Sequence, residues 1–382
     1  MDDLVRNEVK GMKRYIAGKP ISEVKRELGL EKIVKMASNE NPFGCSKRVG
    51  ESLLKTYQEV ALYPDSSSYS VREALMNRYH RPIEEIFVGG GSDSLIKVIF
   101  STFINKGDEM ITGDHSFSRY EDNAKLSGAV IVRSKMSNLV YDLEDMKNCI
   151  SEKTKIMFLC SPNNPTGSSV GKKEFEKLLQ EVSENIIIVM DEAYREYVTR
   201  EDYFDSLDYL DAHKNLIVLR TFSKAYGMAS LRIGYGFASS EFVNYFYRVI
   251  DPFDVNLFAQ EAAVEALKDQ EFIKMVHEEN KKGKEYFYEE LTKMNLSYVL
   301  SDANFILFDT GENDMLIFER LMKMGYIIRP GTFLNLPGYI RVTISTMENN
   351  LGFMEALKSV LGEIERDRKL EILAADSLKP MR

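Results

Sequence analysis

The sequence has few cysteines, no excess of basic residues and no long apolar run. Cys45, Cys149 and Cys160 are odd in number and show no CxxC spacing, which argues against a disulfide framework and against a zinc site. The formal net charge of −9 argues against the basic surface that nucleic-acid binding requires. Strongly apolar runs such as residues 186–190 are far shorter than the roughly 20 residues that span a bilayer. We expect no bound metal, and neither nucleic acid nor a membrane as a partner.

The amino terminus also lacks the features of an export signal. It reads MDDLVRNEVK, whereas a secretory signal needs a basic start followed by an apolar stretch. Together with the cysteine pattern this predicts a cytoplasmic protein. A chain of 382 residues exceeds the roughly 250 to 300 residues at which a single core stops growing, so we expect two domains.

Short apolar runs alternate with helical stretches between about residues 83 and 238, which is typical of a largely parallel sheet covered on both faces. The later part has long charged helices and sparse strands, which favours an α+β lobe. The expected fold class is therefore α/β, with a mostly parallel seven-stranded sheet in a large domain, residues 35–270. Residues 1–34 and 271–382 are expected to form the smaller domain. The seven expected strands are 86–88, 110–112, 129–132, 155–160, 186–190, 216–219 and 233–238.

Four polar segments follow apolar strands, at the edge where open α/β sheets bind their ligands. The first, GGGSD at 89–93, opens a helix whose amides suit a phosphate. It lacks the third glycine of a dinucleotide motif and the GK[ST] of a P-loop, so an ordinary strand-to-helix turn is the alternative. The second, SPNNPTG at 161–167, is rich in turn formers, and an ordinary loop is its alternative.

The third and fourth segments carry a carboxylate and an amine. Asp191 directly follows the apolar run IIIVM, where a buried carboxylate is costly unless a cation or hydrogen-bond donors pair with it. A structural N-cap is the alternative for this residue. Lys224 lies in TFSK between an apolar strand and a glycine-rich segment, and Arg232 follows eight residues later. Enclosure lowers the pKa of a lysine and makes it a nucleophile toward an aldehyde.

In this order, SPNNPTG, DEAY and TFSKAYGMASLRIGYG resemble the signature of fold-type-I pyridoxal-phosphate-dependent aminotransferases. Within that superfamily the chain is most similar to the histidinol-phosphate aminotransferase family over residues 18–351, through KMASNENPFG, LYPD, GGGSD, IIRPGTF and YIRVTISTMENN. Two places depart from that family. Arg precedes Tyr15 where the family has Pro, and His-Ser precedes Phe117 where it has Pro-Thr. Both departures concern the substrate end of the site.

The resemblance implies pyridoxal 5'-phosphate as the cofactor and a role for each matching residue. Lys224 would carry the cofactor as a Schiff base and move the proton during transamination. Asp191 would pair with the pyridine nitrogen, which must stay protonated to draw electrons. The other implied contacts are ring hydrogen bonds from Asn164 and Tyr194, stacking by Phe117, phosphate contacts from Ser92, Asp93, Thr221, Ser223 and Arg232, and a phosphate contact from Tyr63 across a homodimer interface.

The resemblance also implies two substrates. Arg341 would bind the α-carboxylate of glutamate or 2-oxoglutarate, a bidentate task that suits arginine. Arg329 and Tyr15 would bind the phosphate of a small phosphorylated amine or carbonyl compound, histidinol phosphate in that family, and Asn41 is a further implied contact. A surface ion pair is the alternative for Arg329.

Other functions stay open on the sequence. One is transamination of another phosphorylated compound, such as a triose phosphate, and another is decarboxylation of a phosphoamino acid on the same fold. A third is a regulatory domain of this fold, but the roughly 35 residues before KMASNENPFG are too few for a DNA-binding domain of ordinary size.

Overall fold

The structure is a computed structural model that describes residues 2–12 and 19–377. Its contacts divide the chain into two compact units. Unit 1 comprises Met1–Tyr15, Glu40–Lys281 and Val299–Asn304, and unit 2 comprises Ile16–Asn39, Lys282–Tyr298 and Phe305–Arg382.

This division differs from the expected one at the amino terminus, since residues 2–12 group with the large sheet. Arg6 explains the difference, because its Nη2 donates to the carbonyl of Leu126, 2.8 Å away. The short helix α1 (Asn7–Lys10) lies in the same segment, beside α6 (Ser118–Ser127). The later boundary falls inside the long helix α11 (Gln270–Lys293).

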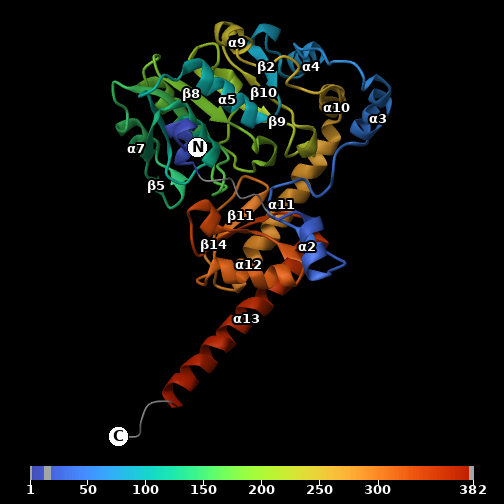
Figure 1. The fold of residues 1–382 in the computed structure, drawn as a ribbon, viewed down its shortest axis with the longest axis vertical. Helices are drawn as coiled ribbons and strands as arrows, with labels where there is room; N and C mark the ends of the chain where they lie inside the picture. Colours follow the sequence, from blue (N-terminus) through green and yellow to red (C-terminus); the bar gives the residue numbers. More distant parts are fainter. Residues whose placement is uncertain (1, 13–18, 378–382) are drawn as a thin grey trace. The chain divides into compact units, whose positions relative to one another are not determined.

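Unit 1 is built on a seven-stranded sheet in the order β2-β10-β9-β8-β7-β3-β4 (Figure 1). Strand β10 is antiparallel to both of its neighbours, and the other adjacent pairs are parallel. The expected mostly parallel α/β sheet is therefore confirmed. Its strands are β2 (Ile86–Gly89), β3 (Glu109–Gly113), β4 (Val130–Ser134), β7 (Thr154–Cys160), β8 (Ile187–Asp191), β9 (Leu216–Thr221) and β10 (Gly234–Phe237). A small hairpin, β5 (Met136–Ser137) with β6 (Val140–Tyr141), accompanies it.

Both faces of this sheet are apolar, because successive residues of a strand point to opposite sides. Val189 and Leu219 belong to one face, which we call the α5 face. Met190 and Val218 belong to the other, which we call the α4 face. The α5 face is covered by α5 (Ser92–Phe103), α6 and α9 (Ser240–Phe246). The α4 face is covered by α3 (Lys47–Thr56), α4 (Tyr69–Tyr79), α7 (Leu143–Asn148), α8 (Lys172–Glu181) and α10 (Leu257–Lys268).

Unit 2 is an α+β fold around its own apolar core. A three-stranded antiparallel sheet has the order β11 (Phe305–Asp309), β14 (Tyr339–Thr343), β13 (Arg329–Pro330). A second, parallel pair joins β1 (Val34–Lys35) to β12 (Tyr326–Ile327). The α-helices of this unit are α2 (Ile21–Leu28), α12 (Asp314–Lys323), α13 (Met347–Ser377) and the part of α11 that starts at Lys282.

Helix α13 is labelled near the carboxyl end of the chain in Figure 1. Its later turns carry exposed apolar side chains, among them Leu370 and Leu373. Within residues 2–12 and 19–377, no helix has the length and apolar character of a membrane span.

Candidate active site

Three of the expected site residues meet at the carboxyl edge of the large sheet. Asn164, Tyr194 and Lys224 lie in the segments that follow the parallel strands β7, β8 and β9. The Nδ2 of Asn164 donates to the hydroxyl of Tyr194 at 3.3 Å. The Nζ of Lys224 lies 5.6 Å from the centre of the Tyr194 ring. The fold therefore places an amine beside two hydrogen-bonding groups.

Asp191 is the last residue of β8 and is buried on the α5 face. Its Oδ1 accepts the amide of Ala193 at 3.1 Å, and its Oδ2 accepts the hydroxyl of Tyr120 at 2.7 Å. Burial raises the pKa of Asp191 to about 6, although both hydrogen bonds act in the opposite direction. A cation placed beside such a carboxyl favours its charged form. The Asp191 carboxylate therefore fits a ligand whose protonated ring nitrogen can donate a hydrogen bond to it.

Tyr120 is a site residue that the sequence analysis missed. It follows Phe117 by three residues, and the two rings meet edge to face with their centres 5.6 Å apart. Burial places the pKa of Tyr120 well above its usual value, so the hydroxyl stays a donor to Asp191. The spacing of three residues from Phe117 was the available signal, because residues three apart are neighbours on a helix.

Replacing Tyr120 by phenylalanine is expected to lower kcat about 10-fold, because a hydrogen bond to a charged group contributes about 1.5 to 3 kcal/mol. Steady-state kinetics and thermal unfolding would measure the effect. Tyr235→Phe is the matched control, since it removes another buried hydroxyl, bonded to Tyr79 at 2.8 Å. Equal losses of activity in both variants would show that Tyr120 matters for the fold alone.

The start of α5 brings together several groups that can donate hydrogen bonds to an anion. Gly91 precedes α5 with φ +96°, and no side chain caps the helix there. The amides of Ser92 and Asp93 therefore have no acceptor within the helix. Arg232 lies close by, because a Cβ added to Gly91 would be 2.6 Å from its Nη2. Its Nη1 also donates to the hydroxyl of Ser223 at 3.4 Å. Amides, a hydroxyl and a guanidinium thus meet where a phosphate would bind.

Two further residues hold the loops around these donor groups. Asp254 accepts the amide of Gly90 at 2.6 Å and the hydroxyl of Ser94 at 3.0 Å. Thr221 ends β9, and its Oγ1 accepts the amide of Ser223 at 3.1 Å. Asp254 was not among the expected residues, since nothing in its local sequence indicates that it reaches the glycine loop.

Asn41 lies against the segment that carries Lys224. Its Nδ2 donates to the carbonyl of Ala225 at 2.8 Å. The approach is close, because a Cβ added to Gly227 would lie 1.8 Å from the carbonyl oxygen of Gly44. Glycine is therefore needed at position 227, where φ is +70°.

Tyr63 is not brought to the other expected residues. Its side chain is 82% exposed and stacks on Phe253 with ring centres 4.7 Å apart.

The two expected substrate arginines lie in unit 2. Arg329 on β13 and Arg341 on β14 are directly opposite each other in the sheet register. Arg341 is buried, and its Nη2 donates to the carbonyl of Ala37 at 2.8 Å. Arg329 is only 7% exposed, which excludes the surface ion pair considered as its alternative. Tyr15 lies outside the described residues.

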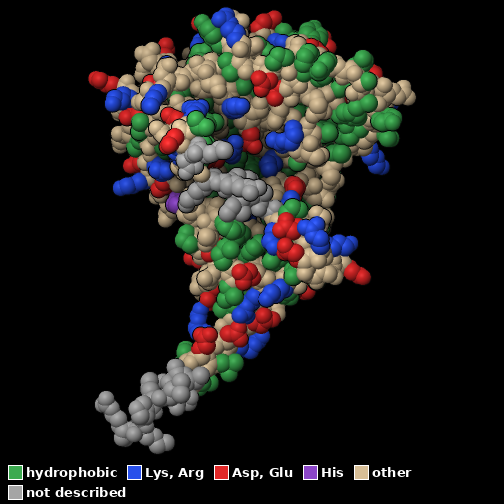
Figure 2. Space-filling view, in the orientation of Figure 1, with side chains coloured by type: hydrophobic (Ala, Val, Ile, Leu, Met, Phe, Trp, Pro, Cys, Tyr) green, Lys and Arg blue, Asp and Glu red, His purple; other side chains and the backbone are tan. Residues whose placement is uncertain are grey.

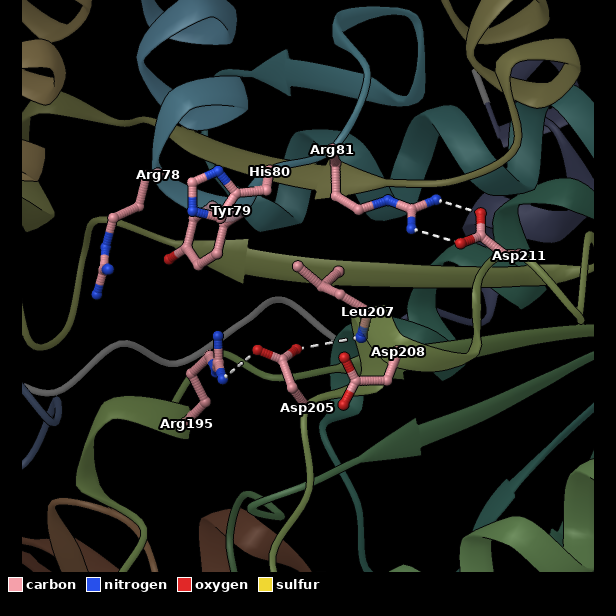
Figure 3. Close-up of a pocket in the computed structure, with 9 residues that line it drawn as sticks. All are labelled: Arg78, Tyr79, His80, Arg81, Arg195, Asp205, Leu207, Asp208 and Asp211. Carbon is pink, nitrogen blue, oxygen red and sulfur yellow. Dashed lines mark hydrogen bonds and ion pairs between the residues drawn. The ribbon is translucent and has the colours of Figure 1, made fainter.

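A pocket of about 520 Å³ lies elsewhere in unit 1 (Figure 3). None of the expected site residues lines it. It lies where the end of α4 faces an ion pair between Arg195 and Asp205. Its lining residues are Arg78, Tyr79, His80, Arg81, Arg195, Asp205, Leu207, Asp208 and Asp211. No group of His, Cys, Asp and Glu suited to a metal ion occurs in residues 2–12 and 19–377.

The family described as "Aminotransferase class I and II" matches residues 31–357. The chain belongs to this family. It is 43% identical to a histidinol-phosphate aminotransferase of Caldicellulosiruptor saccharolyticus, over 94% of this chain and 100% of that one. It is 41% identical to the histidinol-phosphate aminotransferase of Moorella thermoacetica, over 93% and 92%.

Solved structures of this family have the same fold. The histidinol-phosphate aminotransferase of Sinorhizobium meliloti in complex with pyridoxal-5'-phosphate has a TM-score of 0.86 at 23% identity, covering 94% of this chain and 98% of that one. That of Clostridium acetobutylicum has a TM-score of 0.79 at 26% identity, covering 87% and 100%. The chain is a fold-type-I, pyridoxal-phosphate-dependent aminotransferase.

Proposed function

We propose that this aminotransferase moves an amino group between glutamate or 2-oxoglutarate and a small phosphorylated compound, with histidinol phosphate as the leading substrate, in histidine biosynthesis. The observation that carries the proposal is the pair of buried arginines, Arg329 and Arg341, opposite each other in one sheet. The names of the relatives at about 40% identity support the choice of histidinol phosphate. The cytoplasmic location stays a prediction.

The cofactor contacts remain proposals that the geometry supports. Bound pyridoxal phosphate would withdraw electrons from the substrate carbon. Lys224 would hold the cofactor through its amine and move the proton at the substrate carbon, and Asp191 would balance the positive charge of the ring nitrogen. The other proposed contacts are Asn164 and Tyr194 to the ring hydroxyl, Phe117 to the ring face, and Ser92, Asp93, Thr221, Ser223 and Arg232 to the phosphate. Asn41 and Tyr15 remain proposed substrate contacts.

The two arginines are expected to separate by substrate. Arg341→Ala should lower kcat/KM for glutamate about 100-fold, because it removes a bidentate, charge-assisted contact. Arg329→Ala should lower kcat/KM for histidinol phosphate by a similar factor, and it should lower kcat/KM for glutamate less. Half-reactions followed in each direction would measure both effects, with Arg→Lys variants as controls that keep the charge.

Two outcomes would contradict the substrate proposal. Equal turnover of histidinol phosphate and unphosphorylated histidinol would remove the phosphate from recognition. Release of carbon dioxide from a phosphoamino acid, without any keto-acid acceptor, would make the enzyme a decarboxylase.

We also propose a homodimer whose two sites each use Tyr63 of the other subunit. Exposed apolar side chains gather over α3 and the segment after it (Figure 2), and contiguous apolar surface of this kind marks interaction sites. These residues are Leu54, Tyr57, Val60, Leu62 and Tyr63.

Mixing Tyr63→Ala and Lys224→Ala subunits would test this arrangement. If Tyr63 crosses the interface, each hybrid dimer contains one intact site, because the Lys224→Ala subunit lends its Tyr63 to the other. Random reassortment should then restore about one quarter of wild-type activity at limiting cofactor. The unmixed variants are the controls. No recovery on mixing, or a fully active monomer, would contradict the proposal.

A further inference from the structure

A cluster of charged side chains lies on the α4 face, opposite the proposed cofactor site; Arg220 and Glu192 are buried and Asp205 is partly exposed. Arg220 in β9 is 0% exposed, and its Nε and Nη2 both lie 2.8 Å from Oε2 of Glu192. Its Nη2 also donates to Oδ1 of Asp205 at 2.6 Å. The other carboxylate oxygen of Glu192 accepts the hydroxyl of Ser206 at 2.6 Å. None of these contacts involves the residues proposed to hold the cofactor.

Two residues of the cluster are nevertheless next in sequence to residues of that site. Glu192 follows Asp191, and Arg220 precedes Thr221. Because side chains alternate along a strand, Asp191 and Thr221 point to the α5 face while Glu192 and Arg220 point to the α4 face. The amide of Glu192 donates to the carbonyl of Leu219 at 2.8 Å, which holds the two strand ends together.

The charges of Glu192 and Arg220 affect the ionisation of Asp191. Glu192 is a second buried carboxylate directly after Asp191, and its negative charge opposes the ionisation of Asp191. Glu192 is among the groups that raise the pKa of Asp191, after burial and beside Asp93. Arg220 compensates the charge of Glu192 at close range. Without Arg220, Glu192 would be left with less compensation in a low-dielectric interior.

Of the cations near Glu192, Arg220 makes the closest contact with it. Arg195 is farther, at 3.8 Å, and pairs instead with Asp205 at the wall of the pocket in Figure 3. Further titratable groups interact with Asp191 or with Arg220: Asp93, Tyr120 and Cys160 with the first, and Glu196, Tyr79, Tyr203 and Tyr235 with the second.

We infer that Arg220 and Glu192 are positioning residues for the cofactor: their ion pair on the α4 face keeps Asp191 ionised and in place on the α5 face. The inference rests on the proposed role of Asp191. It predicts that breaking the pair changes the electronic state of the bound cofactor, beyond any loss of stability.

The test compares holoenzymes carrying Arg220→Met, Glu192→Gln and both changes. The pH midpoint of the visible absorbance, the affinity of the cofactor-free protein for pyridoxal phosphate, and kcat and KM are measured at a temperature where each variant is folded. Arg220→Met should raise the absorbance midpoint by about 1 pH unit. Asp191 would be less ionised in this variant, so the ring nitrogen would be less protonated and the ring would withdraw fewer electrons from the chromophore. We expect kcat to fall about 10-fold with the KM for glutamate nearly unchanged. The double variant should return both the absorbance midpoint and kcat most of the way to the wild-type values, because it no longer contains the carboxylate of Glu192 that Arg220 would compensate.

An unchanged midpoint in folded Arg220→Met, with only a lower melting temperature, would show a purely structural pair and overturn the inference. If Arg220→Met does not fold, Arg220→Lys takes its place, because lysine keeps the charge without the two-pronged contact. It should give a smaller shift in the same direction, and no shift would again overturn the inference. Asp191→Asn separates the two proposals: if it leaves the midpoint unmoved, the role of Asp191 itself is wrong.

Discussion

Replacing Lys224 by alanine is expected to lower kcat by about 10⁴-fold or more, because the variant loses both the covalent attachment of the cofactor and the carrier of the proton. The position of the amine supports this result. Its Nζ lies over the ring of Tyr194, at the strand edge that also carries Asn164. Single-turnover kinetics with glutamate would measure the loss.

Two controls distinguish chemistry from binding in this variant. Lys224→Arg keeps a positive charge but no nucleophilic amine, and it should be as inactive as Lys224→Ala. A small added amine should partly restore proton transfer in Lys224→Ala. Borohydride reduction of the wild-type enzyme should leave the cofactor on the peptide that contains Lys224. A cofactor fixed to another lysine would refute the assignment.

Asp191→Ala is expected to lower kcat about 100-fold or more, because a fixed charge is lost beside the reacting ring. The structure shows why the loss should be large: the carboxylate is buried and oriented by Tyr120 and Ala193. Asp191→Glu keeps the charge and should retain more activity. Near-normal turnover in Asp191→Ala would remove this residue from the mechanism.

The same carboxyl should cost stability when no cofactor is bound. Its folded pKa, about 6, lies above the ordinary value of 3.8, so the protonated form favours folding. That contribution is complete below about pH 4 and disappears as the pH rises through 6. Asp191→Asn should therefore melt at a higher temperature than the wild type above pH 6, measured on cofactor-free protein. A difference that does not vary with pH would contradict this expectation.

The sequence was informative where short motifs coincide with strand ends. Asn164 and Lys224 follow buried strands and Asp191 ends one, and the apolar runs alone predicted where these strands and the loops after them lie. Tyr120 and Arg220 escaped notice because their roles depend on tertiary contacts. A helix must dock with one particular face for Tyr120 to reach Asp191, and the partners of Arg220 come from separate segments. The sequence around a residue does not say which residues of other segments it will contact in the fold.

The alternation along β8 and β9 limits how these strands can change in length. A single inserted residue would turn Asp191 toward the α4 face and Glu192 toward the α5 face, because a shift of one residue reverses every side chain. Exchange of one apolar residue for another of similar volume costs much less. We therefore expect homologous chains, and variants selected in the laboratory, to tolerate substitutions within these strands and to confine insertions and deletions to the loops beyond them.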